Sequence, residues 1–364
     1  MNVAEDTIDW LRTEHLQAPE QWSYLLPTGF SWWADRYLQT IEIIGEETGP
    51  AGESGYLVCV RTELLRDVEL TESALTEINA LPMRCASMAG PVYDVPARRL
   101  DLWSLVRVTD DNGGWIRFLL GAAAVAQLAE ARMLAPVLAK ALGALPATSD
   151  HPESGPRTVP DQMAFAAGTF VDSGDRPSAW SEDEFADAVS QYMNSPAATA
   201  TVEGQGVSVE FPFGEQTSRC RLMADQPHPL YGNGLLVLQR FPVKASCDDE
   251  GIRMALSLNA ADLTRQVNGY GLGSYVYADG ALHYTGFVPN ALHKPGLLGN
   301  LYSSCAARAQ MMAARFTEGT WDADAFSLDP MALARRLNRQ RAAAPVFERP
   351  LRGCPMMRAK AGGN

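Results

Sequence analysis

The order of the expected helices and strands occurs twice along this chain, and this repetition restricts the fold more than any other feature of the sequence. Each copy predicts a helix, then strands, a second helix, two further strands and a closing helix. A stretch rich in Pro, Ser and Gly, residues 146–160, separates the copies and has the composition of a linker. Because one such unit leaves a face of its sheet uncovered, we expect two units to bury those faces against each other or to leave a groove between them.

In the first copy, the elements are defined by apolar residues at helical spacing, by β-branched and aromatic runs, and by turn residues. They are a helix at 4–17, strands at 36–44 and 56–65, a helix from Thr71, strands at 100–108 and 114–119, and a helix at about 121–144. The last two strands are expected to form a hairpin across the turn at 110–113. Pro136 is expected to kink or split the closing helix.

In the second copy, Ser181 and Glu184 have the spacing of a capping box, which predicts the start of a helix. The elements are a helix at about 181–194, strands at 207–211, 219–223, 235–241 and 252–258, a helix at 260–267, strands at 274–277 and 282–288, and a helix at 296–316. The copies align at segments 70–76 and 258–264, each expected to lead from a strand into a helix.

Three segments of the second copy resemble a known family. They are the Leu258–Asn259 junction, the hairpin GSYVYADGALHYTGFVPN at 273–290, and the Ala- and Arg-rich helix that contains Arg308. Over about residues 20–320 the chain resembles tandem actinobacterial members of the type III secretion chaperone and YbjN superfamily. This resemblance implies an α+β fold made of two tandem copies of a helix–antiparallel sheet–helix unit in a pseudo-two-fold arrangement. It also implies binding of partner peptides without ATP, and it supplies no catalytic residues.

The chain is therefore expected to have four parts. They are a first unit with a Trp-rich N-terminal segment at 1–145, a linker at 146–177, a second unit at 178–320 and a basic tail at 321–364. The formal net charge is −13, but residues 331–364 carry eight basic side chains and one acidic one, so residues 1–330 carry −20. Three interpretations of the tail stay open: a solvated segment, a segment that docks on the acidic body, or a site for an anionic partner.

Composition excludes several classes of protein. An apolar fraction of 46% and a charged fraction of 20% are ordinary for a folded chain of 364 residues. The acidic body argues against nucleic-acid binding outside the tail. The longest nearly continuous apolar run, residues 118–126, is too short for a membrane span, and no signal peptide is visible. Six scattered cysteines without a C-x-x-C pair favour reduced thiols and a cytoplasmic protein.

No motif in the sequence predicts catalysis. The glycine cluster at 269–273 follows a helix and opens a strand, whereas a phosphate-binding loop follows a strand and opens a helix. The five histidines lack metal-ligand spacing, and the acidic clusters at 248–250 and 322–324 lie in predicted loops or before helices. We therefore expect no catalytic residues, no metal, no cofactor and no enzymatic activity.

Nine aromatic residues are the candidates for peptide contact, since aromatic side chains are enriched in binding surfaces. They are Trp22, Phe30, Trp32, Trp33, Tyr231, Tyr275, Tyr277, Tyr284 and Phe287. For the N-terminal group, a core or a lid over the first sheet is the alternative to a groove wall.

Together these observations predict a non-enzymatic protein that holds segments of client proteins in a groove or at a sheet edge. A structural subunit of a stable complex is the alternative, and an enzyme with a dispersed site is the third hypothesis. The expected partners are client segments, a second copy of the chain is allowed as a partner, and no membrane insertion is expected.

Overall fold

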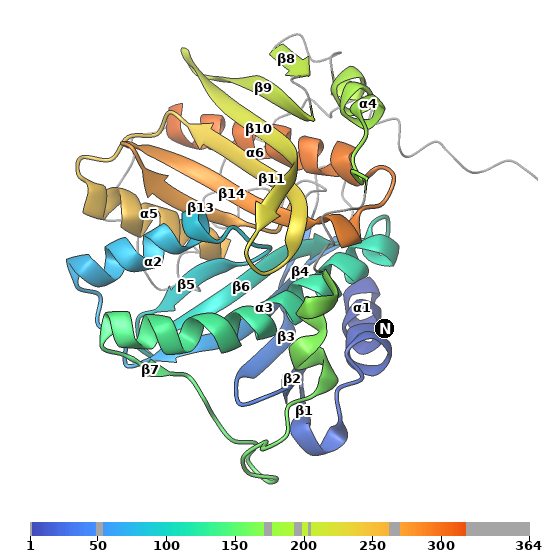
Figure 1. The fold of residues 1–364 in the computed structure, drawn as a ribbon, viewed down its shortest axis with the longest axis vertical. Coiled ribbons are helices and arrows are strands. Elements are labelled where there is room, and N and C mark those ends of the chain that lie inside the picture. Colours follow the sequence, from blue (N-terminus) through green and yellow to red (C-terminus); the bar gives the residue numbers. More distant parts are fainter. Residues whose placement is uncertain are drawn as a thin grey trace, which may run out of the picture.

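The computed structural model describes residues 2–48, 54–170, 177–192, 199–202, 205–261 and 270–317. These residues form two antiparallel sheets and six α-helices (Figure 1), which confirms the expected α+β class. The basic tail and most of the predicted helix at 260–267 lie outside the described residues.

The first half of the chain contributes three helices and seven strands. They are α1 (Val3–Trp10), β1 (Ser23–Leu26), β2 (Gly29–Trp33), β3 (Leu38–Thr48), β4 (Ser54–Arg66), α2 (Glu72–Arg84), β5 (Gly90–Asp94), β6 (Arg99–Val108), α3 (Gly113–Leu142) and β7 (Leu145–Pro146). A π-helical turn at Leu11–His15 and a 3-10 turn at Glu20–Trp22 connect α1 to β1.

The second half contributes a further three helices and seven strands. They are α4 (Glu182–Tyr192), β8 (Thr199–Val202), β9 (Gly206–Phe213), β10 (Gln216–His228), β11 (Gly232–Phe241), α5 (Asp248–Ala261), β12 (Tyr270–Gly271), β13 (Ser274–Ala278), β14 (Ala281–Pro289) and α6 (Leu297–Thr317). A 3-10 segment at Gln162–Phe170 precedes α4.

The strands have the same order in both sheets. In the first sheet the order is β1-β2-β3-β4-β6, with β5 on the free side of β6. In the second sheet it is β8-β9-β10-β11-β14-β13. The short strand β12 belongs to the second half by sequence but pairs with β6, so it adds to the first sheet. The described elements therefore follow the same path through both sheets.

One long helix covers one face of each sheet. Figure 1 shows α3 in front of the first sheet and α6 behind the second. The α3 residue Gln127 donates to Ser104 of β6 at 2.8 Å, and Gln239 of β11 donates to the carbonyl of Cys305 in α6 at 2.9 Å. These bonds mark the inner face of each sheet. Because side chains alternate along a strand, the neighbours of Ser104 and Gln239 lie on the outer faces.

Helix α3 is long and apolar enough to cross a bilayer, yet 72% of its most apolar window is buried within the structure. One side of α3 packs on the first sheet. The other side contacts the second half, where Ala126 and Ala129 lie in one cluster with Tyr231 and Phe287. A helix buried between two bodies needs an apolar surface all round, which explains its composition.

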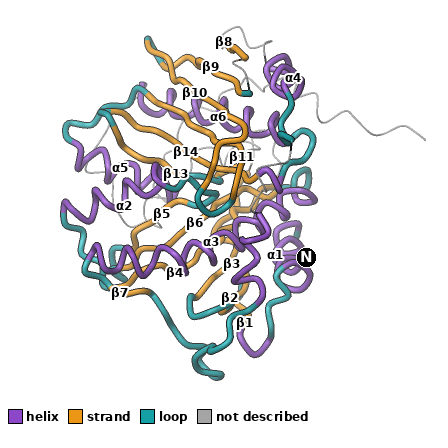
Figure 2. The backbone as a smooth tube through the Cα atoms, in the orientation of Figure 1, coloured by secondary structure: helices purple, strands orange, loops and turns teal. Residues whose placement is uncertain are grey.

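The two halves join at α2 and α5, which lie side by side in Figures 1 and 2. Asn79 of α2 hydrogen-bonds both backbone groups of Tyr277 in β13, at 2.7 and 2.9 Å. Asn259 of α5 accepts from the backbone N–H of Tyr275 and donates to the carbonyl of Pro91 in β5 at 3.2 Å. Each helix thus reaches the edge strand of the other half, and the apolar clusters contain residues of both halves.

Two predicted strands are helices. Residues 114–119 form the start of α3, where Ile116, Leu119 and Leu120 are buried at helical spacing while Trp115 and Phe118 are exposed. β6 instead pairs with β4 and β5. Residues 252–258 lie in α5. From Met254 onward this helix is buried between the two halves, so its residues show no helical period that would distinguish them from a strand.

The predicted alignment of the copies is also wrong in register. Residues 70–71 precede α2, whereas Leu258 and Asn259 lie inside α5. The segments that correspond in the structure are Ile78-Asn79-Ala80 and Leu258-Asn259-Ala260. In each of them the asparagine hydrogen-bonds to the backbone of an edge strand in the other half. Pro136 does not split α3, which runs unbroken to Leu142. The other predicted strands are confirmed. The helices predicted at 4–17, from Thr71, at 181–194 and at 296–316 are also confirmed, with ends shifted by a few residues.

Candidate functional site

The strand β1 ends the first sheet, as Figure 1 shows, and among the described strands it pairs only with β2. A terminal strand has one row of backbone N–H and C=O groups that faces away from the sheet and can pair with another chain. Two apolar side chains of β1 are exposed, Leu25 at 71% and Tyr24 at 38%. We call this strand with Trp22, Trp33 and His151 the β1 edge.

Aromatic rings support the β1 edge from within. The ring of Tyr24 lies 5.8 Å from that of Trp33, which is buried. The imidazole of His151 meets both tryptophans edge-on, at 5.2 Å from Trp33 and 6.3 Å from Trp22. Trp22 is partly exposed, because it lies in the turn just before β1. The β1 edge therefore combines a strand whose outer backbone groups are not paired in the sheet with a set of packed aromatic rings beneath it.

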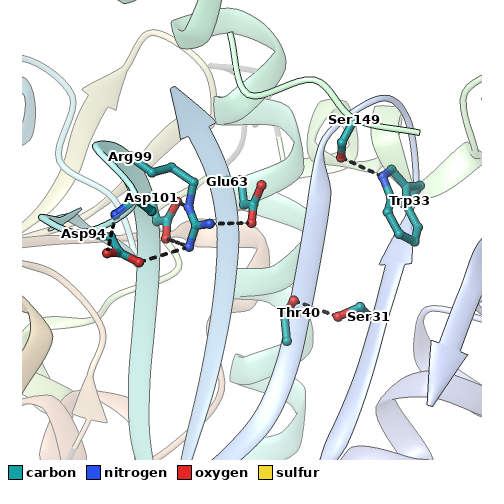
Figure 3. A network of polar contacts seen from close by, with 9 residues as sticks. Ser31, Trp33, Thr40, Glu63, Asp94, Arg99, Asp101 and Ser149 are labelled. Atoms are coloured by element: carbon teal, nitrogen blue, oxygen red, sulfur yellow. Dashed lines mark hydrogen bonds and ion pairs between the residues drawn. The ribbon is translucent and has the colours of Figure 1, made fainter. Parts of the chain in front are cut away.

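The segment predicted as a linker holds these rings in place. Its first residues form β7, which pairs with β4, and the carbonyl of Trp33 accepts from the Arg157 guanidinium at 2.6 Å. The indole N–H of Trp33 donates to the Ser149 hydroxyl at 3.0 Å (Figure 3). Residues 145–161 lie against the first sheet, and we call them the strap, whereas residues 162–170 pack on α3.

His151 is fixed in one tautomer. Its Nδ1 accepts the backbone N–H groups of Glu153 at 3.2 Å and Ser154 at 3.0 Å, so the proton sits on Nε2. That Nε2 is buried and has no hydrogen-bond partner among the described residues. Because the Nδ1 lone pair is used by these two N–H groups, the imidazole is held in one orientation against the rings of Trp22 and Trp33.

Eight of the nine aromatic candidates are buried. Phe30 and Trp32 lie on the inner face of the first sheet, and Tyr275 and Tyr284 pack edge-on at 5.1 Å in the second half. The remaining buried candidates are Trp33, Tyr231, Tyr277 and Phe287. Burial gives these residues a packing role, and their contact with a peptide stays a prediction. Only Trp22 and Trp33 come together at the β1 edge.

A polar cluster at the junction of the halves was missed by sequence reasoning. Glu130 of α3 is buried and accepts from the hydroxyls of Tyr231 at 2.6 Å and Ser87 at 3.3 Å. Burial raises the pKa of Glu130 to about 7, although these two hydrogen bonds lower it. The sequence does contain one signal for this cluster: Glu130 is the single acidic residue of an Ala-rich apolar helix. A charge in such a helix needs hydrogen-bond partners if it is buried.

Beside Glu130, the thiol of Cys85 lies 3.4 Å from Nε2 of His228. This pair is not arranged for nucleophilic catalysis. Burial raises the pKa of Cys85 to about 11. The Nδ1 of His228 accepts the backbone N–H groups of Leu230 and Tyr231, so Nε2 carries the proton and donates it to the carbonyl of Ala86 at 2.9 Å. The cluster links the two halves and leaves no free base.

The outer face of the first sheet carries a second polar network (Figure 3). Arg99 contacts Asp101 at 2.7 Å, Glu63 at 3.0 Å and Asp94 at 3.5 Å. Burial raises the pKa of Asp101 and of Glu63, and the nearby Arg99 opposes both shifts. In this network one guanidinium holds three carboxylates in a largely enclosed setting, so it stabilises this face of the sheet and offers little room for a ligand.

Within the described residues, no group of three or more His, Cys, Asp or Glu side chains could hold a metal ion. The β1 edge is the candidate site because it combines a terminal strand with exposed apolar side chains, which are the features of a surface for an extended chain. Comparison of the chain with protein-family models, with curated proteins and with solved structures found no match.

Proposed function

We propose that this chain is a chaperone-like, non-enzymatic protein that binds extended segments of client proteins at the β1 edge. In this proposal the two halves are tandem copies of one helix–antiparallel sheet–helix unit in a pseudo-two-fold arrangement, and the protein acts in the cytoplasm. The common strand order and the reciprocal asparagines, Asn79 and Asn259, support the duplication. The resemblance to type III secretion chaperones supports the function.

The observation that carries the proposal is the exposure of Tyr24 and Leu25 on a terminal strand. Exposed apolar residues on a sheet edge favour pairing with another chain, and proteins usually block such edges with charges or prolines. β1 itself, with the sequence Ser-Tyr-Leu-Leu, contains neither. A client strand would bond to the free backbone of β1 and place alternate side chains against Tyr24 and Leu25.

The opposite edges of the two sheets are less suited to this role. β13 is occupied by Asn79 and Asn259, and β5 receives a hydrogen bond from Asn259 through Pro91. At β1, the strap and the rings of Trp33 and His151 fix the strand before any partner arrives. A preformed edge loses little conformational entropy on binding, which favours affinity.

Binding of a short labelled peptide of alternating valine and threonine, followed by fluorescence anisotropy, tests the proposal. Leu25→Lys and Tyr24→Lys should each weaken binding by about tenfold or more, because a charge on the edge opposes strand addition. The same peptide N-methylated at alternate residues should not bind, since it lacks the pairing N–H groups.

The matched control is Val137→Lys, which places the same charge on an equally exposed apolar site of α3, 67% exposed. This variant should bind the peptide like the parent protein, and thermal unfolding should show that all variants fold. Equal binding of the N-methylated peptide, or an equal loss in Val137→Lys, would contradict the proposal. A single partner of fixed stoichiometry bound away from β1 would favour the structural-subunit alternative instead.

A further inference from the structure

Two cysteines of the second half face each other inside the protein. Cys220 lies on β10 and Cys305 on α6, and their side chains are buried, at 1% and 2% exposed. Both are free thiols, and the two thiols hydrogen-bond to each other. We call them the thiol pair. Because a disulfide forms only between cysteines whose side chains can meet, this contact satisfies the first requirement for one.

The fold of the second half brings the two sulfur atoms together. Cys220 lies directly opposite Gln239 in the register of β10 and β11. The side-chain amide of Gln239 donates to the backbone carbonyl of Cys305 at 2.9 Å, which fixes α6 over this part of the sheet. Both cysteines belong to the apolar cluster that contains the inner face of the second sheet and α6. The contact therefore follows from the packing of the helix on the sheet.

The two thiols differ in acidity. Cys220 donates its S–H to Cys305, and this hydrogen bond lowers the pKa of Cys305 and raises that of Cys220. Burial opposes the lowering at Cys305, and the guanidinium of Arg308, one turn further along α6, supports it. Arg308 is itself buried and stacks on the ring of Tyr284 at 3.5 Å, which holds its charge in place. Because the thiolate is the reactive form, Cys305 is arranged to react first.

The other described cysteines have different surroundings. Cys59 is buried in the first sheet, Cys247 is exposed, and the thiol of Cys85 contacts the imidazole of His228. Among the described residues, no second sulfur contacts any of these three. In this part of the chain, the thiol pair is therefore the place where a disulfide can close without rearrangement of the backbone.

We propose that the thiol pair is a redox site, at which a hydroperoxide oxidises Cys220 and Cys305 to a disulfide that fastens α6 to the second sheet. The Cys305 thiolate attacks one oxygen of hydrogen peroxide, so that an S–O bond forms and the O–O bond breaks. The hydroxide that leaves takes up the proton released by Cys305 and becomes water, and Cys305 is then a sulfenic acid.

The second step closes the disulfide. The sulfur of Cys220 attacks the sulfenic sulfur of Cys305, the S–S bond forms, the S–O bond breaks, and a second water leaves with the proton of Cys220. The two thiols lose two electrons and two protons in total, and one hydrogen peroxide is reduced to two water molecules. A thiol reductant reverses the change by exchange with the disulfide.

Burial decides how this site responds. Peroxide reaches the sulfur atoms only when α6 opens locally from the sheet, so oxidation should be slow in the folded protein. A disulfide from residue 220 to residue 305 closes a long loop and restricts the unfolded chain, so it should lower the equilibrium constant of unfolding by about a hundredfold. The site is independent of the β1 edge, because it lies between the second sheet and α6.

Treatment of the folded full chain with hydrogen peroxide tests the inference. Digestion without reductant and mass spectrometry should find Cys220 linked to Cys305. Urea unfolding should show a constant about a hundredfold smaller than in the reduced protein, and dithiothreitol should restore it. Cys59→Ala is the matched control, since it removes another buried cysteine and should gain the same stabilisation. Cys220→Ala and Cys305→Ala, each compared with its own reduced form, should gain none.

Dimedone, which traps sulfenic acids, tests the order of the two steps. It should label Cys305 in Cys220→Ala at least about tenfold more than Cys220 in Cys305→Ala, because Cys305 is the more acidic thiol. Equal labelling would overturn the role of Cys305 as the first thiol to react. Two thiols that stay reduced, a disulfide to Cys247 in place of this pair, or equal stabilisation of Cys305→Ala by peroxide would overturn the redox site itself.

Discussion

The outer faces of the two sheets belong to strands with the same connectivity, yet their charges are arranged in opposite ways. On the first sheet, Arg99 is surrounded by Asp101, Glu63 and Asp94, and Asp101 is only 1% exposed. On the second sheet, Arg219 faces Arg240 and its side chain is 63% exposed. In the first arrangement three carboxylates share one guanidinium in a largely enclosed setting, whereas in the second two exposed arginines lie opposite each other and one of them contacts Glu210.

This contrast shows how one strand order can serve two purposes. A sheet that is covered on both faces must satisfy every buried charge internally. A sheet that is covered on one face can place charges in water at small cost. The first sheet contributes a free edge at β1. The outer face of the second sheet is exposed around Arg219 and Arg240 and packs against α3 at Phe287. We therefore expect mutations at comparable positions to differ greatly in their effect on stability.

The largest effect is expected for Arg99→Met. It leaves Asp101 and Glu63 without their cation in a buried setting, so the free energy of unfolding should fall by about 3–5 kcal/mol at neutral pH. Because protonation relieves the buried charge, the loss should shrink as the pH is lowered. Urea unfolding at several pH values measures both effects.

The matched variant on the second sheet is Glu210→Gln, which removes the acid beside exposed Arg219. Its effect on the free energy of unfolding should stay below about 1 kcal/mol and should disappear in high salt. If Glu210→Gln lowered the free energy of unfolding as much as Arg99→Met, the contrast between an enclosed ion network and an exposed ion pair would be wrong.

An intermediate effect is expected at the junction, for Glu130→Gln. The folded state holds the Glu130 proton up to a pH of about 7, whereas the unfolded carboxyl releases it near its ordinary value of 4.5. Stability of the parent protein should therefore fall as the pH rises between these values, by about 3 kcal/mol, and this contribution should be constant above pH 7.

The Glu130→Gln variant lacks the titrating group, so its profile should omit this fall. The difference between the unfolding free energies of the two proteins, measured against pH, isolates Glu130 because the other titrating groups are common to both. Parallel profiles across this range would show that Glu130 is not the buried acid that couples the halves.

The smallest effect is expected for Arg240→Gln. Removing one of two opposed arginines should raise the free energy of unfolding by about 0.2–1 kcal/mol at low salt, and the gain should vanish at high salt. Chemical unfolding at two salt concentrations checks this. A loss of stability would mean that Arg240 is neutralised within the chain and is not repelled by Arg219.

The sequence predicted much of the local structure because period and turn residues act over short distances. The strands around Val207, Leu235 and Leu282 follow from alternation and β-branched residues, and α6 follows from an apolar stripe. Residues 252–258 were assigned to a strand because α5 is surrounded by both halves. From Met254 to Ala260 every residue of this helix is buried, so no helical period can be read from that stretch.

The candidate site was predictable only in part. The density of aromatics near the N-terminus indicated the region, and Trp22 and Trp33 do lie at the β1 edge. The exposure of Leu25 and the support from His151 could not be predicted, because the strap reaches β1 from more than a hundred residues away in the sequence. Contacts of that kind depend on the packed structure.

The sequence alone determined the repeated order of elements, the acidic body and the absence of recognisable catalytic motifs, because these follow from composition and from neighbouring residues. Tertiary structure decided which aromatic residues are buried, which strand edge is free, and which charges face one another across strands. These properties arise from the pairing of distant segments. Arg99 and Arg240 both lie in strands, and only the side chains that the fold brings beside them give Arg99 a structural role and leave Arg240 exposed.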